Sequence, residues 1–315
     1  MLRRSFIKQT ALATTAISLN KYGLIKTGVT DSTSPKAIPI SIFSKNLHWL
    51  NIKDMAVLVR QMGFDSIDLT VRDKGHVLPE KVTEDLPKAI SIIKNEGLSV
   101  HCITTAITDV SEPTTEAIIK TASNAGIKYY RMGWYTYAKS QSVEKNLDII
   151  REKMNLLSSM NKIYGIHGCY QNHAGEYFGA PLIDLYTVIK DFDPRWIGCQ
   201  FDIRHATAEG AHSWPIGFDL LKNYIKTINV KDFQWQKKDN KWIEQNVPLG
   251  TGMVDFKKYV ELLKKISFNG PVCIHYEYPL GGAEDGATQL SIPKEKVIEN
   301  MKIDLATLKK MLADF

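Results

Sequence analysis

The sequence contains none of the cysteine patterns that zinc ribbons and dithiol redox centres require. Its 315 residues include four cysteines, and no two of them form a CxxC pair. Each lies in a short apolar segment that we expect to be a strand. We therefore predict four buried core residues and no disulfide bond. These residues are Cys102, Cys169, Cys199 and Cys273.

The chain also lacks a glycine-rich phosphate loop after any apolar segment, which argues against a nucleotide cofactor. Its net charge is +6, but the first 30 residues contain five basic residues and no acidic one, so the remainder carries only +1. That remainder has no block of basic residues of the kind that binds a phosphate backbone. We therefore expect no nucleic-acid partner.

Long hydrophobic runs are missing as well, and we expect no stable membrane span. The apolar run 11–19 is too short to cross a bilayer as a helix. It follows Arg3, Arg4, Phe6 and Lys8, a pattern that resembles a bacterial twin-arginine export signal. The alternative is an ordinary amphipathic helix. We predict an export signal and flexible lead-in over 1–36, a periplasmic or otherwise exported protein, and a single domain over 37–315.

From residue 38 onwards, short apolar runs alternate with segments that have the 3–4 spacing of amphipathic helices. Strict alternation predicts a parallel sheet with helical crossovers, and this length favours an α/β fold of the (β/α)8 TIM barrel type. A doubly wound open sheet is the alternative. Apolar residues on the outer helices permit a homodimer. The expected strands are 38–43, 66–70, 98–104, 127–132, 164–170, 197–201, 224–230 and 271–276.

Polar side chains cluster where several of these strands end, and the clearest case follows 197–201. Asp202 and His205 come directly after this apolar run, although both groups are costly to bury without a partner. In a parallel barrel the carboxyl ends of the strands meet and carry the chemistry. A structural hydrogen-bonded network is the alternative. Other polar residues at predicted strand ends are Asp68, His76, Gln171, His173, Arg204, Asn229, Lys231, His275 and Glu277.

Strings around these strand ends resemble the sugar phosphate isomerase/epimerase superfamily of xylose isomerase-like barrels. In chain order they are GFDSIDL, GHVLPE, QNHAG, FDIRHA, NVKD, VPLGTGMVDF and NGPVCIHYEYP. The resemblance covers roughly residues 38–312. It implies a carbohydrate or cyclitol substrate and proton removal next to a carbonyl. The superfamily includes ketose epimerases, inosose dehydratases, apurinic endonucleases and keto-glycoside lyases.

The resemblance also implies one divalent metal ion, held by a Glu, an Asp, a His and a Glu on four successive strands. The corresponding residues in this chain are Gln171, Asp202, Asn229 and His275. Three of these four differ from the usual ligand, which lowers the affinity expected for Mn²⁺ or Mg²⁺. An alternative set would favour a softer ion such as Zn²⁺ or Co²⁺. It consists of His173, Asp202, His205 and His275.

The resemblance implies roles for the remaining polar residues. We expect Glu277 or His173 to transfer the proton, and His205 to orient the substrate. Lys231 would stabilise the enediolate, particularly without a metal ion. The residues that we expect to contact the substrate are Asp68, His76, Trp134 and Arg204.

The substrate that we expect is an unphosphorylated sugar, because the predicted domain is nearly neutral and has no phosphate cradle. Trp134 could stack on a sugar ring or pack within its loop. Trp235 and Trp242 bracket either a hairpin over the barrel or a solvated loop. The main alternative function is a non-catalytic sugar-binding barrel with a degenerate metal site. An apurinic endonuclease would need a dense set of zinc ligands and a basic face, which this sequence lacks.

Overall fold

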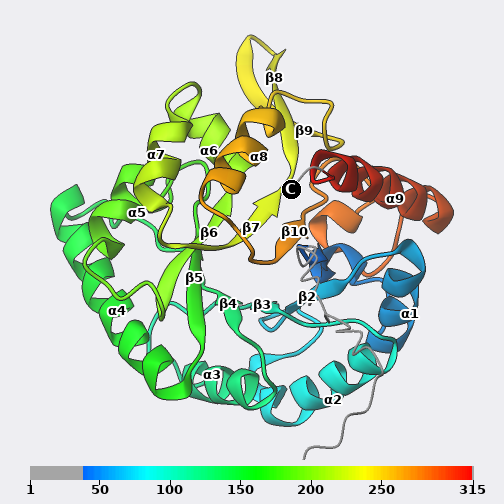
Figure 1. Cartoon of the computed structure of the whole chain (residues 1–315), viewed down its shortest axis with the longest axis horizontal. Coiled ribbons are helices and arrows are strands. Elements are labelled where there is room, and N and C mark those ends of the chain that lie inside the picture. Colours follow the sequence, from blue (N-terminus) through cyan, green and yellow to red (C-terminus); the bar gives the residue numbers. More distant parts are fainter. Residues whose placement is uncertain (1–37, 314–315) are drawn as a thin grey trace, which may run out of the picture. The chain divides into compact units, whose positions relative to one another are not determined.

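The computed structural model describes residues 38–313, which belong to the larger of two units, 38–315. The predicted export signal lies outside the described residues. Eight parallel strands form a closed barrel in the order β1-β10-β7-β6-β5-β4-β3-β2. Helices α1 to α9 surround these strands (Figure 1). This arrangement confirms the predicted (β/α)8 barrel.

The barrel strands are short, and each pairs in parallel with two neighbours. They are β1 (Ile40–Phe43), β2 (Ser66–Thr70), β3 (Cys102–Thr104), β4 (Tyr129–Arg131), β5 (His167–Gln171), β6 (Ile197–Asp202), β7 (Ile225–Val230) and β10 (Val272–Ile274). Several observed strands are shorter than predicted, for example β3 and β10, and at Tyr164 the predicted element is wrong, because this residue ends a helix rather than beginning a strand. Gly165 caps that helix in the left-handed conformation, and β5 follows.

The helices begin and end at recognisable signals. The Asn51 side chain accepts a hydrogen bond from the Asp54 amide at the start of α1, and Gly63 ends that helix with φ +91°. The helices are α1 (Ile52–Met62), α2 (Val82–Asn95), α3 (Thr115–Asn124), α4 (Val143–Tyr164), α5 (Leu182–Ile189), α6 (Ile203–Gly210), α7 (Trp214–Leu221), α8 (Phe256–Lys265) and α9 (Lys294–Met311). Among residues 38–313, no helix combines the length and apolar character that crossing a membrane requires.

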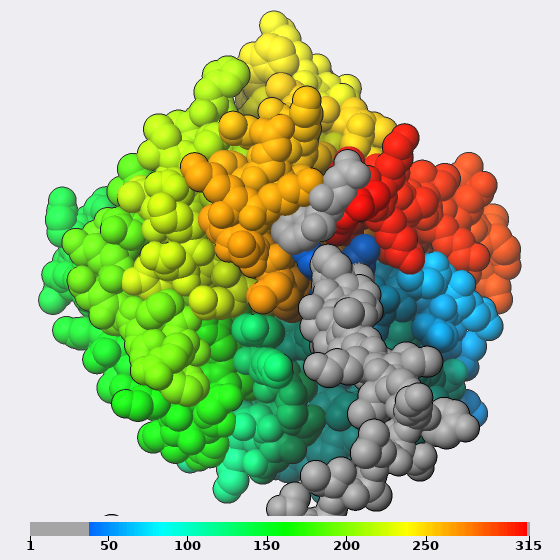
Figure 2. Space-filling model, in the orientation of Figure 1, coloured from blue at the N-terminus to red at the C-terminus, as the bar shows by residue number. Residues whose placement is uncertain are grey.

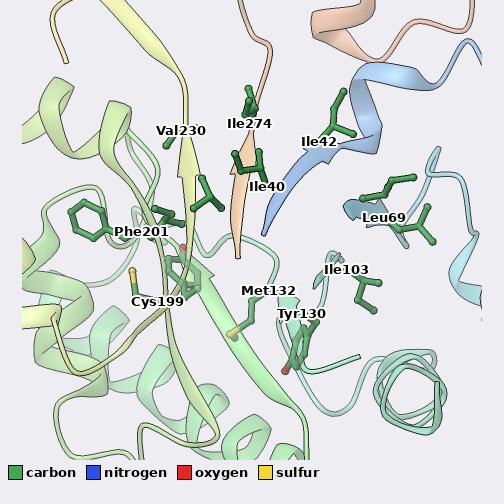
Figure 3. Close-up of a cluster of buried hydrophobic side chains, with 14 of the residues drawn as sticks. Ile40, Ile42, Leu69, Ile103, Tyr130, Met132, Cys199, Phe201, Val230 and Ile274 are labelled. Carbon is green, nitrogen blue, oxygen red and sulfur yellow. The ribbon is translucent and has the colours of Figure 1, made fainter. Parts of the chain in front are cut away.

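The apolar core lies largely between the strands and the helices, and Figure 3 shows part of it. Phe201 of β6 contacts Phe218 of α7 and Tyr259 of α8, with ring centroids 5.2 and 5.9 Å apart. Because side chains alternate along a strand, Gln200 and Asp202 point to the opposite face, into the barrel. The four cysteines are free and buried in barrel strands, which confirms the prediction made for them.

A two-stranded antiparallel hairpin follows β7, so the segment between Trp235 and Trp242 is a hairpin rather than a loop without regular structure. It consists of β8 (Asp232–Lys238) and β9 (Lys241–Val247). Asp239 and Asn240 form its turn with φ values of +49° and +60°, as a type I′ turn requires. Figure 2 shows the yellow hairpin projecting past the neighbouring helices.

Candidate active site

A cluster of ionisable side chains surrounds the Lys231 ammonium at the carboxyl ends of β6, β7 and β10. Its Nζ atom lies 2.7 Å from Glu277 Oε1, 2.8 Å from His205 Nε2 and 3.3 Å from Asp202 Oδ2. Lys231 and Asp202 are buried, whereas the Glu277 side chain is 24% exposed. Glu277 is therefore the most accessible of the four groups. The structure thus brings together Asp202, His205, Lys231 and Glu277, four of the residues that the sequence analysis named as site candidates.

Asp202 positions two parts of this cluster. Its side chain caps α6 by accepting a hydrogen bond from the His205 amide at 3.2 Å, which places the imidazole beside the carboxylate. The Asn172 side chain holds the Asp202 backbone on both sides, because it donates to the Asp202 carbonyl and accepts from its amide, at 3.0 and 2.8 Å. The carboxylate at the end of β6 therefore has a fixed orientation.

The neighbouring charges decide the protonation states. Burial acts to raise the pKa of Glu277, but the Lys231 ammonium and the adjacent histidines hold it well below its ordinary value. Burial, reinforced by Lys231, lowers the pKa of His205 far below its ordinary value. Burial also lowers the pKa of His275 to about 4. At neutral pH Glu277 is therefore a carboxylate, and His205 and His275 are neutral imidazoles.

Gln171 connects this cluster to the opposite side of the barrel. Its Nε2 atom donates to Asp202 Oδ2 at 2.7 Å, and its Oε1 atom accepts from Arg131 at 3.0 Å. On that side, Asp68 accepts a hydrogen bond from Thr104 at 2.9 Å, and burial raises the pKa of Asp68 to about 6. Arg131 is the last residue of β4, but the strand predicted over 127–132 extended past it, and the sequence analysis missed it.

Aromatic rings line the space next to the charged groups. His173 contacts His205 and Trp134, with ring centroids 4.0 and 4.6 Å apart. Arg131 lies over the Trp134 ring at 4.6 Å, and Phe43 stacks on His275 at 4.4 Å. Burial lowers the pKa of His173 as well, so this ring is neutral at neutral pH. Phe43 was also missed, because an aromatic residue in a strand carries no signal that separates a site from core.

Two predicted site residues, Asn229 and His76, are turned to other partners, whereas Arg204 connects the cluster to the hairpin. Asn229 donates to Gln200 Oε1 at 3.0 Å within the barrel. Arg204 lies 3.2 Å from His205 Nδ1, and it also forms an ion pair with Glu244 and donates to Asn246 of the hairpin at 3.1 Å. His76 contacts Thr70 and the His48 ring, and burial lowers its pKa to about 4.

The glycine turn VPLGTGMVDF is built around Asp232. The carboxylate of Asp232 accepts hydrogen bonds from the amides of Gly250, Gly252 and Val254, at 3.0, 2.9 and 3.2 Å. A Cβ atom at Gly252 would lie 2.3 Å from Asp232 Oδ1, so the close approach requires glycine. These contacts explain the turn as a structural element beside the barrel.

The four residues at the expected metal-ligand positions do not form a ligand set. Gln171 and Asn229 present amide N–H groups to their partners, and His275 Nδ1 lies 3.8 Å from Glu277 Oε1. The position between Asp202, His205 and Glu277 is taken by the Lys231 ammonium, which repels a cation. Among residues 38–313, no group of three His, Cys, Asp or Glu side chains is arranged to hold a metal ion. The residues present therefore do not fit the metal that the resemblance implies.

Comparison with known proteins agrees with this architecture. The xylose isomerase-like TIM barrel family matches residues 56–298, and the chain belongs to this family. It is 24% identical over 268 residues to the uncharacterized protein MJ1311 of Methanocaldococcus jannaschii, with 84% of each chain covered.

Among the solved structures that share the fold are a 3-keto-D-glucoside 4-epimerase and the IOLI protein. The 3-keto-D-glucoside 4-epimerase YcjR from E. coli matches with a TM-score of 0.63 and 13% identity, over 86% of this chain and 100% of that one. The IOLI protein with a binding zinc atom matches with a TM-score of 0.67 and 16% identity, over 88% and 99% of the two chains. At these identities the likeness shows the fold.

Proposed function

We propose that this protein is an exported isomerase, epimerase or keto-sugar lyase that removes a proton next to a carbonyl of an unphosphorylated sugar or cyclitol. The observation that carries the proposal is the contact of Lys231 Nζ with Glu277 Oε1 at 2.7 Å, at the barrel end where family chemistry takes place. The pair combines a proton acceptor with a cation that can neutralise the developing oxyanion.

In the proposed reaction, the Glu277 carboxylate takes the α-proton of the substrate. The C–H electrons form a carbon–carbon double bond, and the carbonyl π electrons move to the oxygen. The Lys231 ammonium stabilises the resulting enediolate oxygen. As Lys231 turns towards this oxygen, it withdraws from Glu277, which makes the carboxylate a stronger base at the moment when it must accept the proton. Return of this proton from Glu277 to the neighbouring carbon would give an isomer, whereas an epimer requires a second acid that delivers a proton to the opposite face of the enediolate.

The neighbouring groups suit a neutral polyol. His275 is uncharged at neutral pH, and its Nε2 atom can exchange one hydrogen bond with a hydroxyl group. The buried His275 Nε2 and Trp134 Nε1 atoms have no hydrogen-bond partner among residues 38–313, so both are available to a ligand. Trp134 also offers an aromatic surface against which a sugar ring can pack.

The test is proton exchange in D₂O, followed by NMR, with a panel of unphosphorylated ketoses, aldoses and 3-keto-glycosides. We expect the wild-type protein to introduce deuterium next to the carbonyl of at least one substrate, and Glu277→Gln to slow this by about 10²–10⁴-fold. Glu244→Gln is the matched control. Its side chain is 26% exposed, close to the 24% of Glu277, but it pairs with Arg204. Equal exchange by wild type and Glu277→Gln would contradict the assignment.

The second candidate is a sugar-binding barrel without catalysis. It is favoured by the low pKa of Glu277, because a carboxylate that is held by an ammonium group is a weak base in the resting site. Calorimetric binding of a sugar without any deuterium incorporation would select this function over the enzyme.

A further inference from the structure

We infer that the Lys231 ammonium is the resident cation of this barrel, so that the protein binds no divalent metal ion at the site and Lys231 supplies the positive charge itself. The inference deepens the proposed function and, for the catalytic role of Lys231, rests on it. The claim about metal binding rests on the geometry alone.

The atoms around Nζ form a set that would ligate a metal ion if the ammonium were not there. Two carboxylate oxygens and one imidazole nitrogen, from Asp202, Glu277 and His205, converge on Nζ at 3.3, 2.7 and 2.8 Å. Zinc ligands of these types lie about 2.0–2.2 Å from the ion. Each atom would need to move inward by only about 1 Å. What prevents binding is therefore the ammonium, which occupies the position and opposes a second positive charge.

Gln171 lies where the resemblance implies a glutamate ligand, and its amide suits an ammonium better than a divalent ion. The amide of Gln171 faces Asp202 through Nε2, and Arg131 holds this orientation by donating to Oε1. An amide N–H group cannot ligate a metal ion, whereas a carboxylate at this position could. The N–H group that Gln171 presents to Asp202 therefore suits a site whose cation is the Lys231 ammonium.

The experiment compares metal binding by chelator-treated full-length wild type, Lys231→Met and Lys45→Met. Methionine keeps most of the lysine stem and removes the ammonium. Lys45 is the matched control, because its Nζ atom lies near the same site, 6.0 Å from the centroid of the Phe43 ring, without contacting the three ligand atoms at the centre. Zn²⁺, Co²⁺ and Mn²⁺ are titrated separately by calorimetry, and Co²⁺ is also followed by its visible spectrum.

We expect wild type and Lys45→Met to bind each metal more weakly than about 1 mM, and Lys231→Met to bind about one equivalent of Zn²⁺ or Co²⁺ at least tenfold more tightly. The Co²⁺ complex should show d–d absorption bands. If Lys231→Met is unstable, its melting temperature should rise when Zn²⁺ is added, because a ligand stabilises the state that binds it. Lys231→Gln provides a second neutral variant.

Tight binding of one equivalent by the wild type would overturn the inference, and so would equal binding by wild type and both Lys231 variants. The titration needs no substrate, so its failure is distinct from a failure of the proposed function. Where turnover is detected, we expect chelator treatment to leave the wild-type rate unchanged. Loss of turnover on chelation, with recovery on metal addition, would also overturn the inference.

Discussion

Both sides of the barrel end bury carboxyl groups, but the pKa falls on one side and rises on the other. On the side of β6, β7 and β10, Asp202 and Glu277 share one ammonium at contact distance, and the pKa of Glu277 falls. On the side of β2 to β4, Asp68 is buried with a hydroxyl donor from Thr104, and its pKa rises to about 6. A counter-ion within hydrogen-bond reach outweighs burial, whereas the more distant Arg131 and Arg72 do not.

The comparison predicts that removing the shared cation is the most costly change at the site. Lys231→Met leaves two carboxylates without their counter-ion, one of them fully buried. We expect the free energy of unfolding at pH 7.5 to fall by about 3–5 kcal/mol, measured by urea denaturation. The control Lys222→Met breaks an exposed pair with Asp219 and should cost about 0–1 kcal/mol. Equal costs for the two variants would show that the Lys231 cluster does not behave as a buried ion network.

On the side of β2 to β4, removing a charge should stabilise the protein, and Asp68→Asn is the substitution that does so. Asparagine keeps the acceptor for Thr104 and removes a charge that the folded state disfavours. The pKa of the Asp68 carboxyl rises from 3.8 to about 6 on folding. This rise lowers the free energy of unfolding of the protein by about 3 kcal/mol above pH 6. Below pH 3.8 both states are protonated and nothing is lost, so the penalty grows between these two values.

We therefore expect Asp68→Asn to raise the free energy of unfolding by about 2–3 kcal/mol at pH 7.5. At pH 4 the gain should nearly vanish. Urea denaturation at both pH values measures the difference, with the exposed substitution Asp219→Asn as the control. A gain that is independent of pH would show that Asp68 is ionised in the folded state like any surface carboxylate.

The sequence predicted the barrel well because its signals are local. Apolar runs and helix caps each depend on a few adjacent residues, and the strand Ser66–Thr70 was placed at its observed bounds. The site was predicted less completely. The position of Asp202 at the end of an apolar run was a sufficient signal, but the predicted strand 127–132 extended past Arg131, which is the last residue of β4. The partner of Asn229 is Gln200 on the neighbouring strand. Which of several polar groups pair depends on distances across the barrel, and these are not local.

Gln171 gives the smallest of the three expected effects and the sharpest test of whether the two sides are coupled. Gln171→Leu removes one hydrogen-bond partner from both Arg131 and Asp202. Because Asp202 keeps Lys231, we expect a loss of only about 1–2 kcal/mol in urea denaturation. The control Gln245→Leu, on the hairpin, should change stability by no more than about 0.5 kcal/mol.

A double-mutant cycle then tests what Gln171 does beyond its own two hydrogen bonds. Arg131, released from Gln171, is free to turn towards Asp68 and to lower the pKa of that carboxyl. The gain from Asp68→Asn at pH 7.5 should therefore be smaller in the Gln171→Leu background than in the wild type, by about 0.5–1 kcal/mol. Strict additivity would mean that the two sides titrate independently. In that case Gln171 contributes only its own two hydrogen bonds, and the difference between the paired and unpaired sides arises from their own strands.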